Sequence, residues 1–70
     1  METSARNQLK GTIVSVSLGA VMAEVTIDVN GATVVAVITK ESAERLELTE
    51  GQSVVAIVKA TDVMIGIAPV

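Results

Sequence analysis

The chain has 70 residues, half of them hydrophobic, a formal net charge of −3 at pH 7, and no histidine, cysteine or aromatic residue. This length allows one domain, residues 1–70, and the composition excludes disulfides and removes the usual ligands of structural zinc. Because so short a chain rarely stabilises itself by its core alone, an apolar chain without cross-links predicts an obligate homo-oligomer.

The first predicted strand covers residues 9–18. Within it Val14, Val16 and Leu18 alternate with two serines, which is the period of a strand with one apolar face. Gly19 and Ala20 end the pattern. The alternation predicts that the three apolar side chains share one face.

A hairpin is predicted to follow. Residues 22–29 alternate cleanly between apolar and polar side chains, which predicts a half-buried strand with one solvated face. Asn30 and Gly31 form the dipeptide most typical of a two-residue type I′ turn, which needs positive φ at both positions. Residues 33–38 then form the partner strand. Both of its faces are apolar, so we expect the core to cover one and a second subunit to cover the other.

The periodicity changes over residues 39–48, where Thr39 is a good N-cap and apolar residues recur three apart. This predicts one short helix. Two further strands are predicted over residues 52–58 and 61–67, with Gly66 marking a bulge or a close backbone approach. The order predicts an all-β fold with one short helix, an OB-fold-like five-stranded β-barrel. An open meander capped by the helix is the alternative.

No catalytic constellation is visible. Without histidine or cysteine, acid–base chemistry would need paired carboxylates, but Glu41, Glu44, Glu47 and Glu50 recur every three residues in the manner of a solvated face. We therefore expect no enzyme and no metal bound as a bare cation. The sequence does hold hydrogen-bond donors at the ends of its elements: Ser4, Arg6, Asn7, Thr39, Ser42 and Lys59. Each alone fits capping, fraying or a solvated side chain; a helix start also suits an anion.

Three segments, taken together, carry a resemblance. TSARNQLKG (3–11), VITKESAERLEL (37–48) with EGQ (50–52), and VKATDV (58–63) closely resemble the molbindins, small molybdate-binding proteins of the Mop/TOBE domain family. The likeness covers essentially the whole chain. It implies an OB-like barrel that assembles as a hexamer of three dimers and binds molybdate or tungstate between subunits, with no organic cofactor.

The resemblance also implies site residues. The oxyanion-binding positions carried over are Ser4, Ala5, Arg6, Asn7, Thr39, Lys40, Ser42, Lys59 and Ala60. Lys40 would serve a second class of site near a symmetry axis, and the role of Thr61 is open. The chemistry agrees, because molybdate is a dianion with four acceptor oxygens and needs donors alone, and hydrogen bonds to an ionised acceptor are strong.

The expected function is storage or homeostasis of the oxyanion in the cytoplasm. An anion-responsive regulatory interaction module is the alternative. Nucleic acid is disfavoured as a partner by the acidic charge and the lack of aromatic residues, and the latter also disfavours a stacked pterin. No membrane partner is expected, since the apolar runs are far shorter than the roughly 20 residues that cross a bilayer and no secretory signal is visible.

Overall fold

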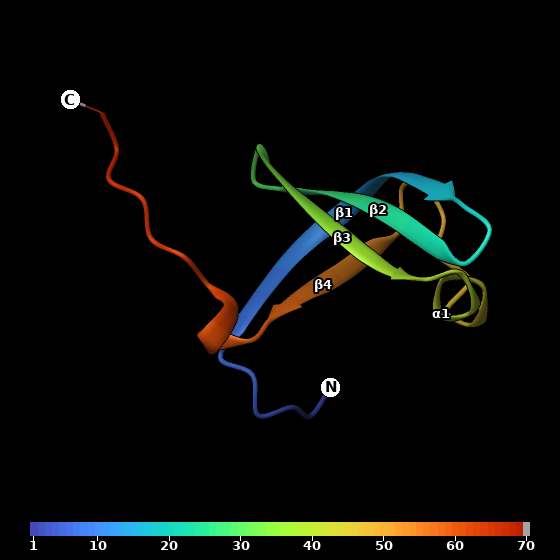
Figure 1. The fold of residues 1–70 in the computed structure, drawn as a ribbon, viewed down its shortest axis with the longest axis horizontal. Helices are drawn as coiled ribbons and strands as arrows, with labels where there is room; N and C mark the ends of the chain where they lie inside the picture. The colour runs from blue at the N-terminus through green and yellow to red at the C-terminus, as the bar shows by residue number, and fades with distance from the viewer. Residues whose placement is uncertain (70) are drawn as a thin grey trace.

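A computed structural model describes residues 1–69. It contains the strands β1 (Asn7–Leu18), β2 (Met22–Val29), β3 (Ala32–Thr39) and β4 (Ser53–Val58), the helix α1 (Lys40–Arg45) and a 3₁₀ turn, η1 (Ala60–Asp62). The strands form one antiparallel sheet in the order β3-β2-β1-β4. The sheet curves into an open half-barrel with α1 at one end and η1 at the other (Figure 1).

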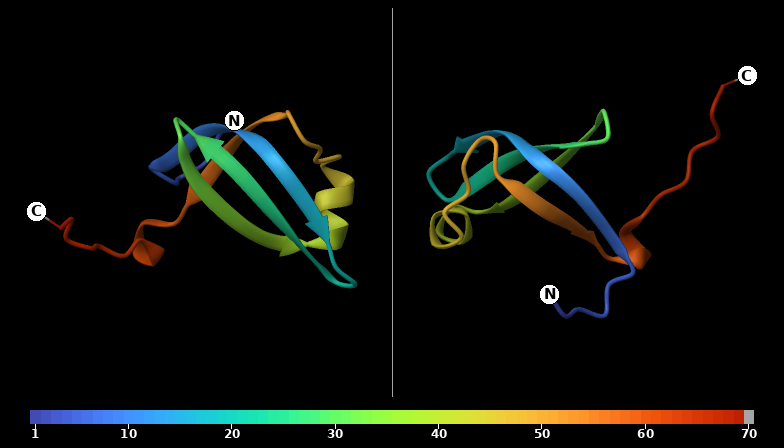
Figure 2. Two further views of the ribbon diagram at one scale, coloured as in Figure 1. Left: turned by 90° about the horizontal axis from the view of Figure 1, so that it is seen from above. Right: turned by 180° about the vertical axis from the view of Figure 1, so that it is seen from behind.

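Strand β1 is shared between two partners. Its first half, from Asn7 to Thr12, pairs with β4, and its second half, from Thr12 to Leu18, pairs with β2. The register with β2 shifts between Ile13 and Ser15, which marks a β-bulge. The bulge bends β1 and lets one strand serve both sides of the curved sheet (Figure 2).

The bulge also corrects the predicted face of β1. Ile13 is 1% exposed and Val16 is half-buried, whereas Val14 and Leu18 are 49% and 54% exposed. The expectation that Val14, Val16 and Leu18 share one face is therefore wrong. The extra residue at the bulge breaks the period of two, which a run of apolar and polar letters does not reveal.

The predicted hairpin is confirmed. In β2, Ala23, Val25 and Ile27 are buried while Glu24 and Asp28 are exposed. The turn has φ of 50° at Asn30 and 88° at Gly31, the positive values that a type I′ turn requires. Strand β3 shows the expected two apolar faces: its inner side chains are half-buried, but Val35 and Val37 are 54% and 61% exposed.

The helix is shorter than the predicted span 39–48. Thr39 caps α1, since its Oγ1 accepts a hydrogen bond from the Ser42 backbone N–H at 3.1 Å. The helix stops at Arg45 because Glu47 takes a left-handed conformation with φ of 53°, and Leu48 N–H donates to Ala43 O at 3.1 Å. This is the closing pattern of a Schellman motif, in which glycine is the usual left-handed residue.

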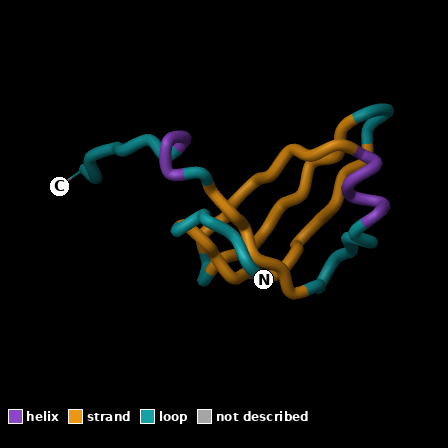
Figure 3. Tube along the Cα trace, turned by 90° about the horizontal axis from the view of Figure 1, so that it is seen from below, coloured by secondary structure: helices purple, strands orange, loops and turns teal. Residues whose placement is uncertain are grey.

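The fifth strand predicted over 61–67 is wrong for the single chain. Ala60–Asp62 form η1, and the residues from Val63 onward pair with no strand in the described part of the chain. Figure 3 shows this C-terminal segment leaving the sheet. A strand needs an unpaired edge beside it, and η1 directs the chain away from both free edges, those of β3 and β4 (Figure 1). The barrel therefore stays open.

The core is small. Ile13, Val25 and Ile27 form its buried centre, with Ala23 and Ala43 buried beside it. Half-buried residues from all four strands and from Leu48 pack around this centre. No buried side-chain polar atom among residues 1–69 lacks a hydrogen-bond partner. The half-barrel thus has a small, well-packed core, but many of its apolar side chains stay exposed to solvent.

Gly11 marks the tightest backbone approach in the sheet. A Cβ added there would lie 2.6 Å from Asp28 O and 2.7 Å from Ile27 Cγ2. We expect Gly11→Ala to lower the free energy of unfolding by about 1–3 kcal/mol, the usual cost of forcing extra atoms into packed structure. Urea denaturation at one protein concentration measures this, with Ser17→Ala, an exposed position on the same strand, as the control. Equal stability of the two variants would contradict the close approach.

Glu47 is a position where a substitution is expected to stabilise the fold. A left-handed conformation costs a non-glycine residue about 1 kcal/mol, so Glu47→Gly should raise the free energy of unfolding by about 0.5 kcal/mol after the entropy of glycine is deducted. Glu44→Gly, inside α1, is the matched control and should lower it by about 1 kcal/mol. Thermal melts distinguish the two, and a loss of stability in both variants would refute the left-handed assignment.

Candidate oxyanion site

The ends of β1 and β4 bring two distant segments together. Asn7 pairs with Val58, the first pair of the β1–β4 ladder, so the residues before Asn7 and after Val58 leave the sheet side by side. They line an open hollow of about 400 Å³ formed by Ser4, Ala5, Arg6, Ile57, Lys59, Ala60 and Thr61. The predicted grouping of the N-terminal segment with the Lys59–Ala60 corner is therefore observed in the structure.

The hollow carries donors and positive charge. Arg6 and Lys59 bring two cations, and Ser4 and Thr61 bring two hydroxyls. No carboxylate is among its lining residues, although the chain as a whole has a net charge of −3. Ala60 and Thr61 also open η1, and the first N–H groups of such a turn have no partner within it. An anion is the ligand that matches this set.

Local hydrogen bonds shape the N-terminal wall of the hollow. The Ala5 N–H donates to Thr3 Oγ1 at 3.2 Å, and Gln8 Nε2 donates to Ala5 O at 2.8 Å. Both polar groups of the Ala5 backbone are thus engaged, so Ala5 shapes the wall but offers no free N–H. Asn7 lies in β1, half-buried, and is not a lining residue.

The remaining predicted residues lie elsewhere. Thr39, Lys40 and Ser42 sit at the start of α1, at the opposite end of the sheet from η1 (Figures 1 and 2). Lys40 is half-buried and its N–H donates to Val21 O at 2.7 Å, which ties α1 to the β1–β2 turn. One copy of the chain therefore does not unite the two groups of predicted site residues.

The two hydroxyls at the start of α1 are ordered by each other. Thr39 Oγ1 donates to Ser42 Oγ at 2.8 Å while accepting from the Ser42 N–H. The Thr39 proton is thereby used. The Ser42 hydroxyl, which accepts from Thr39, keeps its own proton for another acceptor. Within this pair, Ser42 is the side chain that can donate outward.

Sequence reasoning missed Thr3 and Gln8 and left the role of Thr61 open. Thr3 and Gln8 fix the Ala5 backbone, and Thr61 lines the hollow. The signal for Thr61 was present, since it follows Lys59 and Ala60 directly. For Thr3 and Gln8 the spacing of two and three residues from Ala5 allows local hydrogen bonds, but such bonds are seen only once the backbone is known.

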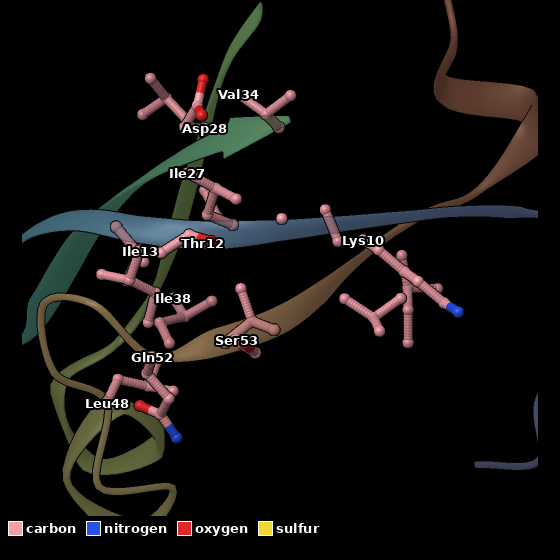
Figure 4. Close-up of a pocket in the computed structure, with 18 of the residues that line it drawn as sticks. Lys10, Thr12, Ile13, Ile27, Asp28, Val34, Ile38, Leu48, Gln52 and Ser53 are labelled. Atoms are coloured by element: carbon pink, nitrogen blue, oxygen red, sulfur yellow. The ribbon is translucent and has the colours of Figure 1, made fainter. Parts of the chain in front are cut away.

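A second, larger hollow is apolar. A groove of about 1180 Å³ runs along the inner face of the half-barrel between β3 and β4. Figure 4 shows it, with Lys10 near one end and Leu48 near the other. Val34, Ile38, Val54 and Ala56 are among the lining residues, and they belong to the two strands with unpaired edges. This groove suits an apolar segment and not an anion.

Other classes of site are absent from the described residues. Between Met1 and Pro69, no three carboxylates come together as a metal site would need. No helix in that range has the length and apolar character to cross a membrane.

Comparison with known proteins gives consistent matches. The TOBE domain model matches residues 3–65. Molybdenum-pterin-binding protein 2 of Clostridium pasteurianum is 46% identical over 93% of this chain and 97% of its own. A molybdate-binding protein of Sporomusa ovata has the same fold, with a TM-score of 0.89 and 40% identity over 93% of this chain and 97% of that one. The cytoplasmic molybdate-binding protein ModG, solved with molybdate bound, matches with a TM-score of 0.82 and 51% identity, over 86% of this chain and 43% of that one.

The family model spans nearly the whole chain, and the identities hold over almost the full length of small relatives. The half-barrel, the N-terminal wall and the Lys59–Thr61 corner all lie within the matched residues. This chain therefore belongs to the TOBE domain family.

Proposed function

We propose that this protein binds molybdate, and tungstate as a chemical analogue, and serves to store or buffer the oxyanion in the cytoplasm without catalysing a reaction. The observation that carries the proposal is the hollow at the ends of β1 and β4, where Arg6, Lys59, Ser4 and Thr61 converge without a carboxylate. Relatives named for molybdate binding support the choice of ligand, and ModG, described as cytoplasmic, supports the location.

The proposed chemistry is recognition by donors alone. A tetrahedral dianion accepts from up to four directions, and guanidinium, ammonium, hydroxyl and backbone N–H groups all donate. Charged donors form the stronger bonds to an ionised oxygen. Thr61 belongs to this set as a hydroxyl donor beside Lys59, in place of the backbone N–H of Ala5, which Thr3 already occupies. The chain has no aromatic residue on which a pterin ring could stack.

We further propose that the complete site forms between copies of the chain. Ser42 holds a free hydroxyl proton at the start of α1, but lies at the far end of the sheet from Arg6 and Lys59. A neighbouring copy can bring its own Thr39–Ser42 pair to the hollow, and Lys40 would then lie near a symmetry axis. The family resemblance predicts a hexamer of three dimers for this arrangement.

Apolar exposure supports assembly. In the C-terminal segment, Met64, Ile65 and Ile67 are 92%, 89% and 97% exposed. The groove between β3 and β4 is apolar, and both strands have a free edge. At about 25 cal/mol per Å² of buried apolar area, leaving three such side chains in water is unfavourable. We propose that the segment from Val63 to Ile67 of one copy lies in the groove of another, as the missing fifth strand.

Anion binding is tested by thermal melting and by calorimetric titration. We expect molybdate to raise the melting temperature, because a ligand that binds the native state alone stabilises it. In calorimetric titration, Arg6→Gln and Lys59→Gln should each weaken binding about 10- to 100-fold through loss of a charged hydrogen bond. Thr61→Val should weaken it less. Arg45→Gln, an equal change of charge on α1 away from the hollow, is the control. An unchanged melting curve at saturating molybdate, or losses equal to that of the control, would refute the site.

Assembly is tested by the C-terminal segment. We expect Met64→Ser combined with Ile65→Ser to shift the protein from oligomer to smaller species in analytical ultracentrifugation, because the variant removes the apolar contact with the partner's groove. Ala68→Ser, a small change in the same segment, should leave the oligomer intact. A wild-type chain that sediments as a compact folded monomer would contradict the proposed assembly.

A further inference from the structure

The hairpin turn between β2 and β3 contains a reactive dipeptide that the proposed function does not use. Asn30 and Gly31 are both exposed at the hairpin tip (Figure 1). A Cβ built on Gly31 would meet no atom within 4 Å, so the space around its backbone is open. Asparagine before glycine is the arrangement in which a backbone nitrogen most readily reaches the preceding side-chain carbonyl carbon, because glycine has no side chain to obstruct it.

Two features of the closed turn restrain the reaction of this dipeptide. The positive φ values of 50° at Asn30 and 88° at Gly31 define a fixed type I′ turn, whereas ring closure requires the Gly31 nitrogen and the Asn30 side chain to move to bonding distance. The Gly31 N–H also donates to Asp28 Oδ1 at 3.1 Å. A carboxylate at this distance disfavours ionisation of the same N–H, since that would place two negative charges side by side.

We propose that Asn30 is a site of spontaneous deamidation, and that Asp28 restrains the reaction while the hairpin is closed. The Gly31 amide loses its proton to solvent base, and the nitrogen bonds to Asn30 Cγ. The Cγ–Nδ2 bond breaks and ammonia leaves, which gives a five-membered succinimide. Water then adds to one of the two ring carbonyls and breaks its bond to the Gly31 nitrogen. The product at position 30 is an aspartyl or an isoaspartyl residue, and water is the sole co-reactant.

The isoaspartyl product has a structural consequence. It adds one methylene to the backbone at the tip and one negative charge beside Asp28. Among the described residues, the backbone of β3 pairs with β2 alone, and β3 leads directly to Thr39 and α1. A turn that no longer fits the ladder therefore loosens the strand that positions the Thr39–Ser42 pair.

The test measures deamidation in the full chain at mildly alkaline pH, below the melting temperature of each variant. Peptide mapping by mass spectrometry follows the change of amide to carboxylate at position 30. We expect Asp28→Ala to accelerate the reaction about fivefold, as for one unit charge about 4 Å from the ionising nitrogen in water. Glu24→Ala, which removes a carboxylate from the same face of β2, should leave the rate unchanged.

Two comparisons keep the proposal falsifiable. A peptide of residues 26–35, which has no fixed turn, should react faster than the full chain and respond little to Asp28→Ala. Asp28→Asn keeps an acceptor oxygen while removing the charge, and should still accelerate the reaction in a hairpin whose retention is checked by amide hydrogen exchange. Equal rates in wild-type chain and peptide would refute the restraint. No acceleration in either Asp28 variant would refute the role of Asp28.

Discussion

The structure depends on one strand that pairs with two others. Because β1 gives its first half to β4 and its second half to β2, the bulge between Ile13 and Ser15 sets the curvature of the whole sheet. The same division determines both hollows. The ladder ends at the Asn7–Val58 pair, where the N-terminal segment and the Lys59 corner emerge together, and the curvature leaves β3 and β4 facing each other across an apolar groove. A straight β1 would produce neither the hollow at the ends of β1 and β4 nor the apolar groove between β3 and β4.

The hollow is lined by positively charged residues, whereas the chain as a whole is negatively charged. An acidic protein collects two of its five cations at one place and keeps its carboxylates out of the lining. Most of the carboxylates lie on the exposed face of β2, on α1 and on the segment that follows α1, whereas Glu2 and Asp62 are near the hollow in sequence but do not line it. This separation favours a compact anion in the hollow and opposes an extended polyanion, which would meet the negative surface around it.

Local patterns predicted most of the fold because they follow from local physics. The alternation in β2, the Asn30–Gly31 turn and the Thr39 cap each depend on a few neighbouring residues, and each is found as expected. The bulge in β1 depends on strands that are far away in the sequence. The conformation of the chain after Lys59 depends on whether a sheet edge, in this chain or in another copy, is available for pairing. The residues VMIGI after Asp62 have the composition of a strand, but a strand also needs an edge to join. The site was predicted by resemblance to a family, and residue patterns alone would not have joined Arg6 to Lys59.

The hydrogen bond from Thr39 to Ser42 determines which of the two hydroxyls at the start of α1 still has a proton to donate. Thr39 Oγ1 donates to Ser42 Oγ at 2.8 Å, so the Ser42 proton is not used between the two hydroxyls. An oxyanion that meets this pair can accept the remaining hydroxyl proton of Ser42, whereas Thr39 Oγ1 already donates to Ser42 and accepts from the Ser42 N–H. An oxyanion that is fully deprotonated at neutral pH can accept there in every orientation. The two hydrogen bonds that cap a six-residue helix thus also decide which of its two hydroxyls has a proton left for a ligand.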